Sequence, residues 1–154
     1  MLFLLFQIGK DRYGLEAGQV VEVVPLVGLK KIPPAPPGVA GILNYHGLLV
    51  PVIDLNEMTI GQLSASRLST RIILVNYPID AEKKHILGLM AEQVTETIQL
   101  DPSTFGDPGI DVPEAPYLGP VARNARGLIQ RIEIKKLIPD ALRDRLFCQT
   151  EECV

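Results

Sequence analysis

The chain has 154 residues, a length that fits one compact domain or two small halves that share a core and that can fold without disulfides or metal ions, and its 47% apolar content is ordinary for a globular protein. Its formal net charge of -3 provides no basic surface to neutralise phosphates, which argues against nucleic acid as a partner. Because no stretch approaches the roughly 20 apolar residues of a membrane-spanning helix, we expect a cytoplasmic protein that does not insert into a membrane.

The first predicted element is a strand over residues 2–8. No basic segment precedes its short apolar run, and Lys10, Asp11 and Arg12 follow at once, so it lacks the organisation of a signal peptide. Farther on, residues 30–38 (KKIPPAPPG) contain two overlapping PxxP spacings, as SH3 ligands do. Because they lie between predicted strands, we favour a connection stiffened by the fixed φ angles of proline.

Residues 41–55 (GILNYHGLLVPVIDL) are the most informative stretch: a tight Asn-Tyr-His-Gly corner leads into an apolar strand that ends on a carboxylate. Asp54 and Glu57 have the spacing of a helix N-cap and an N3 acid, which predicts a short helix at the start of the polar segment 56–69. The two carboxylates could instead act in catalysis, but no nucleophile, base or metal-binding residue lies nearby in sequence. We favour the helix cap.

An internal repeat organises the chain. Residues 13–24 align with residues 87–98 at a constant offset of 74, with identical Gly, Leu, Ala, Gln, Val and Glu in six of the twelve columns. An apolar run and a polar turn precede each copy, and a strand led by glycine follows each, at 47–54 and 127–134. We therefore predict two similar β units in tandem, joined by the segment 56–69.

Strand patterns rich in Ile, Val and Leu continue over residues 71–75, 88–100 and 119–134. Residues 101–116, rich in proline and acids, are predicted to be an exposed loop. A final helix is predicted over residues 135–147, where leucines spaced four residues apart can pack one face against a barrel.

The polar tail, residues 148–154, carries both cysteines, Cys148 and Cys153. Two cysteines can form a redox pair or half of a zinc site, but zinc normally takes four ligands and both histidines are far away in sequence. We expect reduced thiols without a function. The chain also has no GxSxG elbow, no phosphate-binding glycine loop and no HExxH motif, so we predict no catalytic residue, no cofactor, no metal site and no enzymatic activity.

The ordered succession of these elements resembles the CheW-like coupling domains of bacterial chemotaxis-type signalling. The resemblance covers residues 2–138. Its matching segments are YGL (13–15), QVVEV (19–23), IP (32–33), GVAGILNYHG (38–47), VPVIDL (50–55), Gly88-Leu89, Val94, Glu96 and YLGPVA (117–122).

The resemblance implies a mainly β fold of two tandem SH3-like five-stranded barrels with short helices, in agreement with the repeat. We place the first barrel half at about residues 2–58 and the second at 69–134, within a single domain over residues 2–138. It further implies a non-enzymatic adaptor in a two-component system, which binds a CheA-type histidine kinase and the cytoplasmic tip of a methyl-accepting chemoreceptor. Recruitment to membrane receptor arrays would follow from that role.

One departure from the family pattern concerns the corner. Where relatives usually read Asn-Leu-Arg-Gly, this chain reads Asn44-Tyr45-His46-Gly47, so His46 occupies the position of an arginine that contributes to partner binding in relatives and lies near the acid matching Glu22. Arginine is always charged, whereas histidine is shorter and titrates near neutrality. Either the adaptor is specialised for its own receptor and kinase, or His46 merely tolerates an exposed corner.

Apolar residues around the corner are candidate anchors, because non-obligate interfaces depend on a few desolvated side chains. For Val39 and Ile42, a position in the core is the favoured alternative. A groove between the two barrels is the expected seat of a receptor helix hairpin. The complete candidate protein-binding set is Glu22, Val39, Ile42, Asn44, Tyr45, His46 and Leu48.

Two hypotheses from other classes remain open. The first is a small-molecule-binding or enzymatic β-barrel domain, in which His46, Asp54 and Glu57 line a deep polar cavity. The second is a structural subunit with a large symmetric self-interface.

Overall fold

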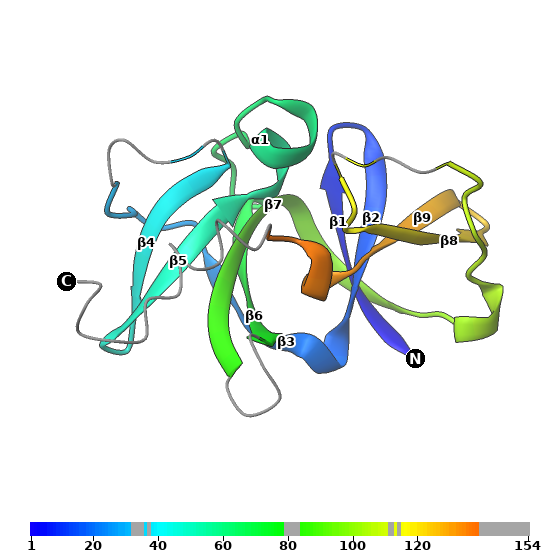
Figure 1. Ribbon diagram of the computed structural model, residues 1–154, viewed down its shortest axis with the longest axis horizontal. Coiled ribbons are helices and arrows are strands. Elements are labelled where there is room, and N and C mark those ends of the chain that lie inside the picture. The colour runs from blue at the N-terminus through cyan, green and yellow to red at the C-terminus, as the bar shows by residue number, and fades with distance from the viewer. Residues whose placement is uncertain (32–35, 37, 79–83, 111–112, 114, 139–154) are drawn as a thin grey trace.

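The computed structural model describes residues 1–31, 36, 38–78, 84–110, 113 and 115–138, and β-strands dominate these residues (Figure 1). The strands are β1 (Leu2–Ile8), β2 (Asp11–Glu16), β3 (Val20–Pro25), β4 (Val39–Tyr45), β5 (Leu48–Asp54), β6 (Arg71–Pro78), β7 (Lys84–Gln99), β8 (Leu118–Asn124) and β9 (Gly127–Ile132). The helical elements in the described ranges are α1 (Leu55–Ile60) and the 3-10 turns η1 (Ala17–Gln19), η2 (Pro102–Thr104) and η3 (Ile134–Lys136).

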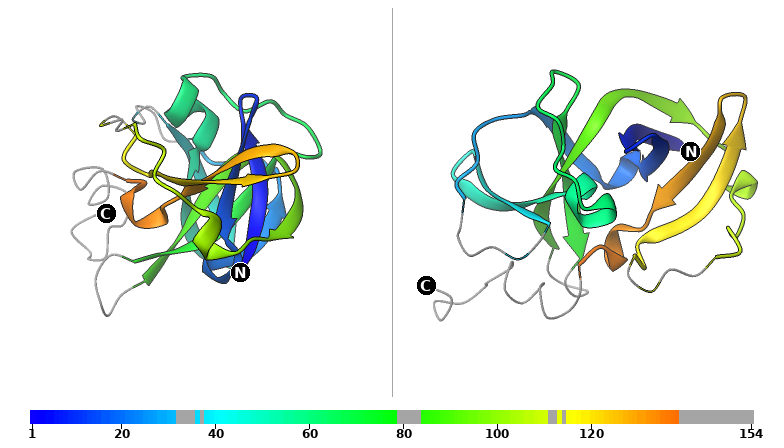
Figure 2. Two further views of the ribbon diagram at one scale, coloured as in Figure 1. Left: turned by 90° about the vertical axis from the view of Figure 1, so that its right-hand side faces the viewer. Right: turned by 90° about the horizontal axis from the view of Figure 1, so that it is seen from above.

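The strands build two SH3-like β subdomains, which confirms the predicted fold class (Figure 2). One subdomain contains the C-terminal half of β7, then β1, β2, β9 and β8, in that order. The other contains β3, β6, the N-terminal half of β7, β5 and β4. Each has one parallel contact, between β2 and β9 or between β5 and β7, at the same place in the order. The predicted repeat is therefore present as two equivalent sets of five strands.

The long strand β7 belongs to both subdomains. Its residues 84–91 pair with β6, and its residues 92–99 pair with β1. Gln93, at the change of partner, has a φ angle of 54°, a backbone conformation that bends the strand. In the other copy of the repeat, Gln19 ends η1, where the chain leaves β2 and enters β3. In both copies of the repeat, the chain thus passes from one subdomain to the other at an equivalent glutamine, Gln19 or Gln93.

This crossing corrects the predicted division into barrel halves. Residues 2–58 and 69–134 do not each build one subdomain, because β1 and β2 pair with β8, β9 and the end of β7, whereas β3 pairs with β6. The physical reason is that each repeated segment continues from one subdomain into the other: residues 13–24 run from β2 into β3, and residues 87–98 follow β7 from its pairing with β6 to its pairing with β1. Each subdomain takes strands from both halves of the sequence, and Figure 1 shows β7 running between the two sets.

Two equivalent glycines allow the parallel strands to approach closely. A Cβ atom on Gly88 would lie 2.8 Å from Cγ2 of Val52 on β5, and one on Gly14 would lie 3.4 Å from Cγ2 of Ile129 on β9. Gly14 and Gly88 occupy equivalent positions in the two copies of the repeat. The glycines therefore mark where each crossing strand packs against its parallel neighbour.

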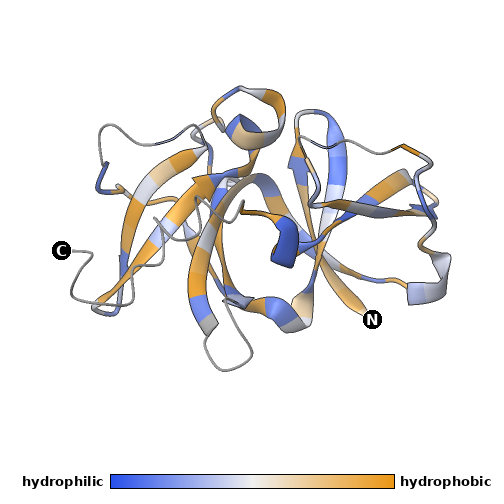
Figure 3. Cartoon of the chain, in the orientation of Figure 1, coloured by the Kyte–Doolittle hydropathy of each residue, from blue (hydrophilic) through white to orange (hydrophobic). Residues whose placement is uncertain are grey.

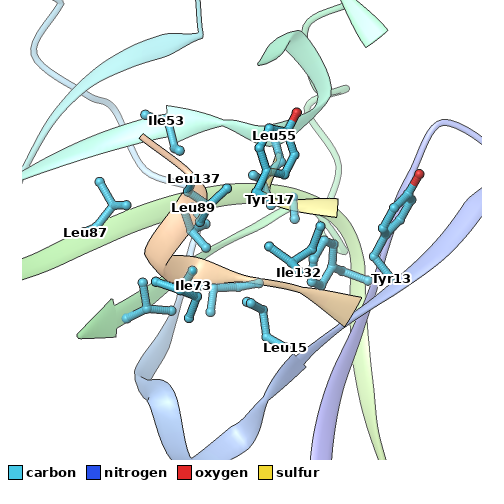
Figure 4. Packing of buried hydrophobic residues seen from close by; sticks show 14 of the residues in the cluster. Tyr13, Leu15, Ile53, Leu55, Ile73, Leu87, Leu89, Tyr117, Ile132 and Leu137 are labelled. Carbon is cyan, nitrogen blue, oxygen red and sulfur yellow. The ribbon is translucent and has the colours of Figure 1, made fainter. Parts of the chain in front are cut away.

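The largest hydrophobic cluster is shared by the two subdomains (Figure 4). Leu15 of β2 and Ile132 of β9 lie in the same buried cluster as Ile53 of β5 and Leu89 of β7, and η3 leads into it through Leu137. Residues 3–6 of β1 and 72–75 of β6 are apolar and buried without interruption, so both faces of these strands are covered, and Figure 3 shows how frequent apolar residues (orange) are along the strands. A shared core makes independent folding of the two subdomains unfavourable.

The predicted helix cap is present at Asp54. Its side chain accepts hydrogen bonds from the backbone N–H groups of Asn56 and Glu57, and Gly61 ends α1 with a φ angle of 72°. Several other predictions fall outside the described residues: most of the PxxP segment (32–35 and 37), residues 139–147 of the predicted C-terminal helix, and the tail (148–154) with both cysteines. Of the predicted final helix, the structure describes only its beginning, where η3 forms a single turn.

Candidate protein interface

The corner between β4 and β5 is a two-residue hairpin turn. Tyr45 pairs with Leu48, which leaves His46 and Gly47 in the loop with φ angles of 53° and 87°. Two consecutive positive φ angles are typical of a type I′ turn, whose twist matches the flanking strands. The side chain of Asn44 accepts a hydrogen bond of 2.9 Å from the N–H of Gly47 and so closes the turn. The sequence therefore builds a defined corner here.

Tyr45 connects this corner to β3, although β3 and β4 are not hydrogen-bonded neighbours. Its hydroxyl donates a short hydrogen bond to Oε2 of Glu22. This bond, followed by burial and the charge of Glu22, raises the pKa of Tyr45 above its usual value, so the hydroxyl keeps its proton at neutral pH. The bond joins two strands of one subdomain through side chains alone.

His46 packs against Tyr45 on the side of the turn. The two ring centroids are 4.5 Å apart with an interplanar angle of 62°, an edge-to-face arrangement. His46 and Glu22 are exposed, and Tyr45 is half-buried between them. The structure thus brings Glu22, Tyr45 and His46 together as one surface feature, with Tyr45 as the residue that contacts both of the others.

The remaining candidate residues have different environments. Leu48 lies beside Tyr45 across the hairpin and is 51% exposed. Val39 is partly buried against the main core, in line with the alternative that assigned it to the interior. Ile42 is partly buried, and its backbone exchanges hydrogen bonds of 3.0 and 2.8 Å with Lys30. Leu48, and not Val39, therefore extends the exposed corner.

The sequence analysis missed Leu49. This side chain is 68% exposed, more than Leu48, and it pairs with Asn44 on the face of the hairpin that also carries Pro51. The signal was the period of two along β5: Val50 and Val52 are fully buried, which directs Leu49 outward. An uninterrupted apolar run concealed that alternation.

An apolar groove of about 790 Å³ lies elsewhere on the same subdomain. Its walls come from the segment after β3, the start of β4, α1, the following loop and β7; they include Leu26, Leu29, Val39, Leu63 and Met90. Asp54 and Glu57 reach this groove, but His46 does not line it.

Every hydrogen bond that the Asp54 carboxylate forms with the described residues stabilises the fold. Besides the two N–H groups of α1, it accepts bonds from the N–H and the hydroxyl of Ser64, at 2.9 and 2.6 Å. Asp54 is 3% exposed, so the carboxylate holds the loop after α1 against the start of that helix. His46, Asp54 and Glu57, the three residues of the alternative catalytic or ligand-binding cavity, therefore do not line one common pocket.

Two further searches of the described residues are informative. They contain no group of three or more His, Cys, Asp or Glu side chains placed to hold a metal ion. None of the helices in these ranges is long and apolar enough to cross a bilayer.

The chain is thus a double-barrel β protein: two SH3-like subdomains exchange strands, and in one of them a side-chain hydrogen bond joins the corner of a hairpin to a strand that does not pair with it. The model of the CheW-like domain family matches residues 2–142, and the chain belongs to that family.

Individual relatives agree. Chemotaxis protein CheW of Klebsiella aerogenes is 26% identical over 98 residues, and Chemotaxis protein CheW of Helicobacter pylori is 27% identical over 98 residues. Each match covers 64% of this chain and 56% of the relative, so the chain spans little more than half the length of these curated relatives. The crystal structure of the scaffolding protein TtCheW from Thermoanaerobacter tengcongensis superimposes with a TM-score of 0.74 and 28% identity, over 86% of this chain and 84% of that one.

Proposed function

We propose that this chain is a non-enzymatic adaptor in a bacterial chemotaxis-type signalling system, where it couples a methyl-accepting chemoreceptor to a CheA-type histidine kinase. The observation that carries the proposal is the likeness, in fold and in sequence, to a CheW scaffolding protein along 86% of the chain. Two relatives named as chemotaxis proteins support the same pathway. Binding to receptors would recruit the adaptor to membrane-bound receptor arrays.

The corner of the β4–β5 hairpin is the proposed contact surface. It combines the exposed side chain of Leu48, on the face of the hairpin that carries Tyr45, with the exposed carboxylate of Glu22, and exposed Leu49 adds an apolar side chain on the opposite face. Interfaces that form and dissociate gain most of their affinity from a few such anchors surrounded by polar groups. The turn geometry and the Tyr45 hydrogen bond hold these groups in place before a partner arrives, which lowers the entropy lost on binding.

The alternative of a catalytic or small-molecule-binding cavity is less well supported. It requires His46 beside Asp54 and Glu57, but only the two acids reach the groove, and the Asp54 carboxylate already accepts four hydrogen bonds from the fold.

Binding assays with the receptor tip and the kinase of the same organism test the proposal. Each purified partner is immobilised and the adaptor is offered in solution; binding to both is the expected result. Binding to neither would refute the adaptor function. Sizing of the adaptor alone addresses the remaining alternative, since a structural subunit would form a large stable assembly with itself.

A further inference from the structure

The apolar groove of about 790 Å³ is the open mouth of the subdomain that contains β3, β4 and β5. Several of its wall residues also pack against the hydrophobic cluster that fills the interior of this subdomain; they are Leu26, Leu29, Ala40 and Met90. The groove offers further apolar surface to a ligand, since Val27 is 45% exposed and Leu63 is 73% exposed. Hollows of this size at the mouth of a β-barrel are common binding sites for small organic molecules.

Glu57 lines this groove and is half-buried. Among the described residues its carboxylate forms no hydrogen bond and no ion pair, whereas the Asp54 carboxylate is engaged by the start of α1 and by Ser64. Lys31 also lines the groove, but this residue is exposed, and its long side chain can keep the ammonium group in water. Partial removal of a carboxylate from water is unfavourable unless a cation approaches it. Glu57 is therefore the group that a ligand can satisfy.

The second subdomain has a hollow at the equivalent place, with a different arrangement of charge. This hollow of about 670 Å³ contains Glu133, the N-cap of η3, and Lys136, the third residue of that turn. Since α1 and η3 follow the equivalent strands β5 and β9, the corresponding positions in the first subdomain are the N-cap Asp54 and the third residue Glu57. Glu133 and Lys136 form an ion pair of 2.8 Å. The first groove thus carries a second acid where the other copy carries its own cation.

We propose that the groove binds a small organic amine with an apolar body. The ammonium group donates a hydrogen bond to the Glu57 carboxylate, and the apolar body lies against the walls that Leu26, Leu29 and Met90 provide. The charge of Asp54, which forms no ion pair with the described residues, adds to the attraction. This site differs from the cavity of the alternative function, because it does not include His46 and carries out no reaction. The inference is independent of the adaptor function.

Two probes with the same hydrocarbon chain, n-octylamine and octan-1-ol, test the inference. Each is titrated into the full chain below the concentration at which it aggregates, and binding is followed by NMR through the backbone amides. Octylamine should shift the amides of groove residues, such as Ala40, Leu63 and Met90. It should bind about tenfold more tightly than octanol, the effect of one charge-assisted hydrogen bond.

Variants of the groove separate the contribution of charge from that of apolar contact. Glu57→Gln should reduce the affinity for octylamine about tenfold and leave the affinity for octanol unchanged. Glu57→Lys, which introduces the residue of the second subdomain, should abolish the preference for octylamine. The matched control is Glu96→Gln, an exposed carboxylate of the other subdomain, which should keep both affinities.

Two further variants change the apolar walls. Ala40→Phe, whose ring fills part of the groove, should abolish binding of both probes. Leu63→Ser, at a side chain that is 73% exposed, should weaken binding of both probes and leave the fold intact. Thermal unfolding of each variant shows whether the fold is retained.

Unchanged affinity of Glu57→Gln for octylamine would overturn the inference, and so would amide shifts confined to other surfaces. Displacement of bound octylamine by the kinase or by the receptor tip would assign the groove to a protein partner and would overturn it as well. None of these results bears on the adaptor function, which the binding assays with the receptor tip and the kinase test separately.

Discussion

Replacing Asp54 tests whether this buried acid stabilises the fold or serves a reactive site. Its carboxylate caps α1 through two backbone N–H groups and fixes the following loop through the N–H and the hydroxyl of Ser64. Removal of an N-cap costs about 1 kcal/mol. Leaving the two donors of Ser64 without a charged acceptor costs about 2 kcal/mol more, because these groups are only partly accessible to water. We therefore expect Asp54→Ala to lower the free energy of unfolding by about 3 kcal/mol.

Urea denaturation followed by circular dichroism measures this change, and the thermal midpoint should fall by about 6–12 °C for a domain of this size. Asp54→Asn retains one acceptor oxygen but directs an amide N–H toward the N–H of Ser64, so a smaller loss of about 1–2 kcal/mol is expected. Asp101→Ala is the matched control, because Asp101 also caps a helical turn, η2, but does so on the exposed surface.

A free energy of unfolding for Asp54→Ala within about 0.5 kcal/mol of that of the unmodified protein, the range typical of surface substitutions, would refute this structural role of Asp54. That result would mean that the four hydrogen bonds contribute little net stability. It would also restore Asp54 as a candidate for a role in ligand binding or catalysis.

Three further predictions address the crossing strand and the corner. Gly88→Ala should destabilise the protein by about 2 kcal/mol in the same denaturation assay, because the new methyl group would lie 2.8 Å from a side-chain carbon of Val52. Gly18→Ala is the control and should change stability little, because no atom lies within 4 Å of its new methyl group. Leu49→Ser should change stability by less than about 0.5 kcal/mol and yet weaken one partner complex at least about fivefold in calorimetry; full affinity would remove this side chain from the interface. His46→Glu, which adds a second carboxylate to the corner, should weaken one of the two complexes, and unchanged affinity for both partners would exclude His46 from the site.

The repeat between residues 13–24 and 87–98 predicted the number and type of units but not their connection. Identical residues at a fixed offset report equivalent environments, and Gly14 and Gly88 do occupy equivalent contacts with parallel strands. Which copy of a strand pairs with which is decided by the path of the chain at Gln19 and Gln93. In one copy this path is a 3-10 turn and in the other a bend within a continuous strand, although the side chain is the same. Local sequence therefore could not reveal the exchange.

The corner was predictable as a turn but only partly as a site. The Asn-Tyr-His-Gly sequence indicates a tight hairpin, and the resemblance to the CheW-like family predicts that His46 lies near Glu22. The hydrogen bond from Tyr45 to Glu22 joins residues 23 positions apart on strands that do not pair, so no periodicity in the sequence signals it. Sequence alone could not separate exposed Leu49 from buried Val50, because residues 48–53 form one apolar run and the alternation appears only in their burial.

Reconstitution of the three-component complex tests the central claim most directly. Receptor tips displayed on membranes are mixed with the histidine kinase and with increasing amounts of this adaptor, and the kinase that sediments with the membranes is measured. An adaptor that couples the two proteins predicts that sedimented kinase rises with adaptor concentration and saturates. Kinase sedimentation that is independent of the adaptor, over a concentration range in which the adaptor itself is folded, would contradict the account.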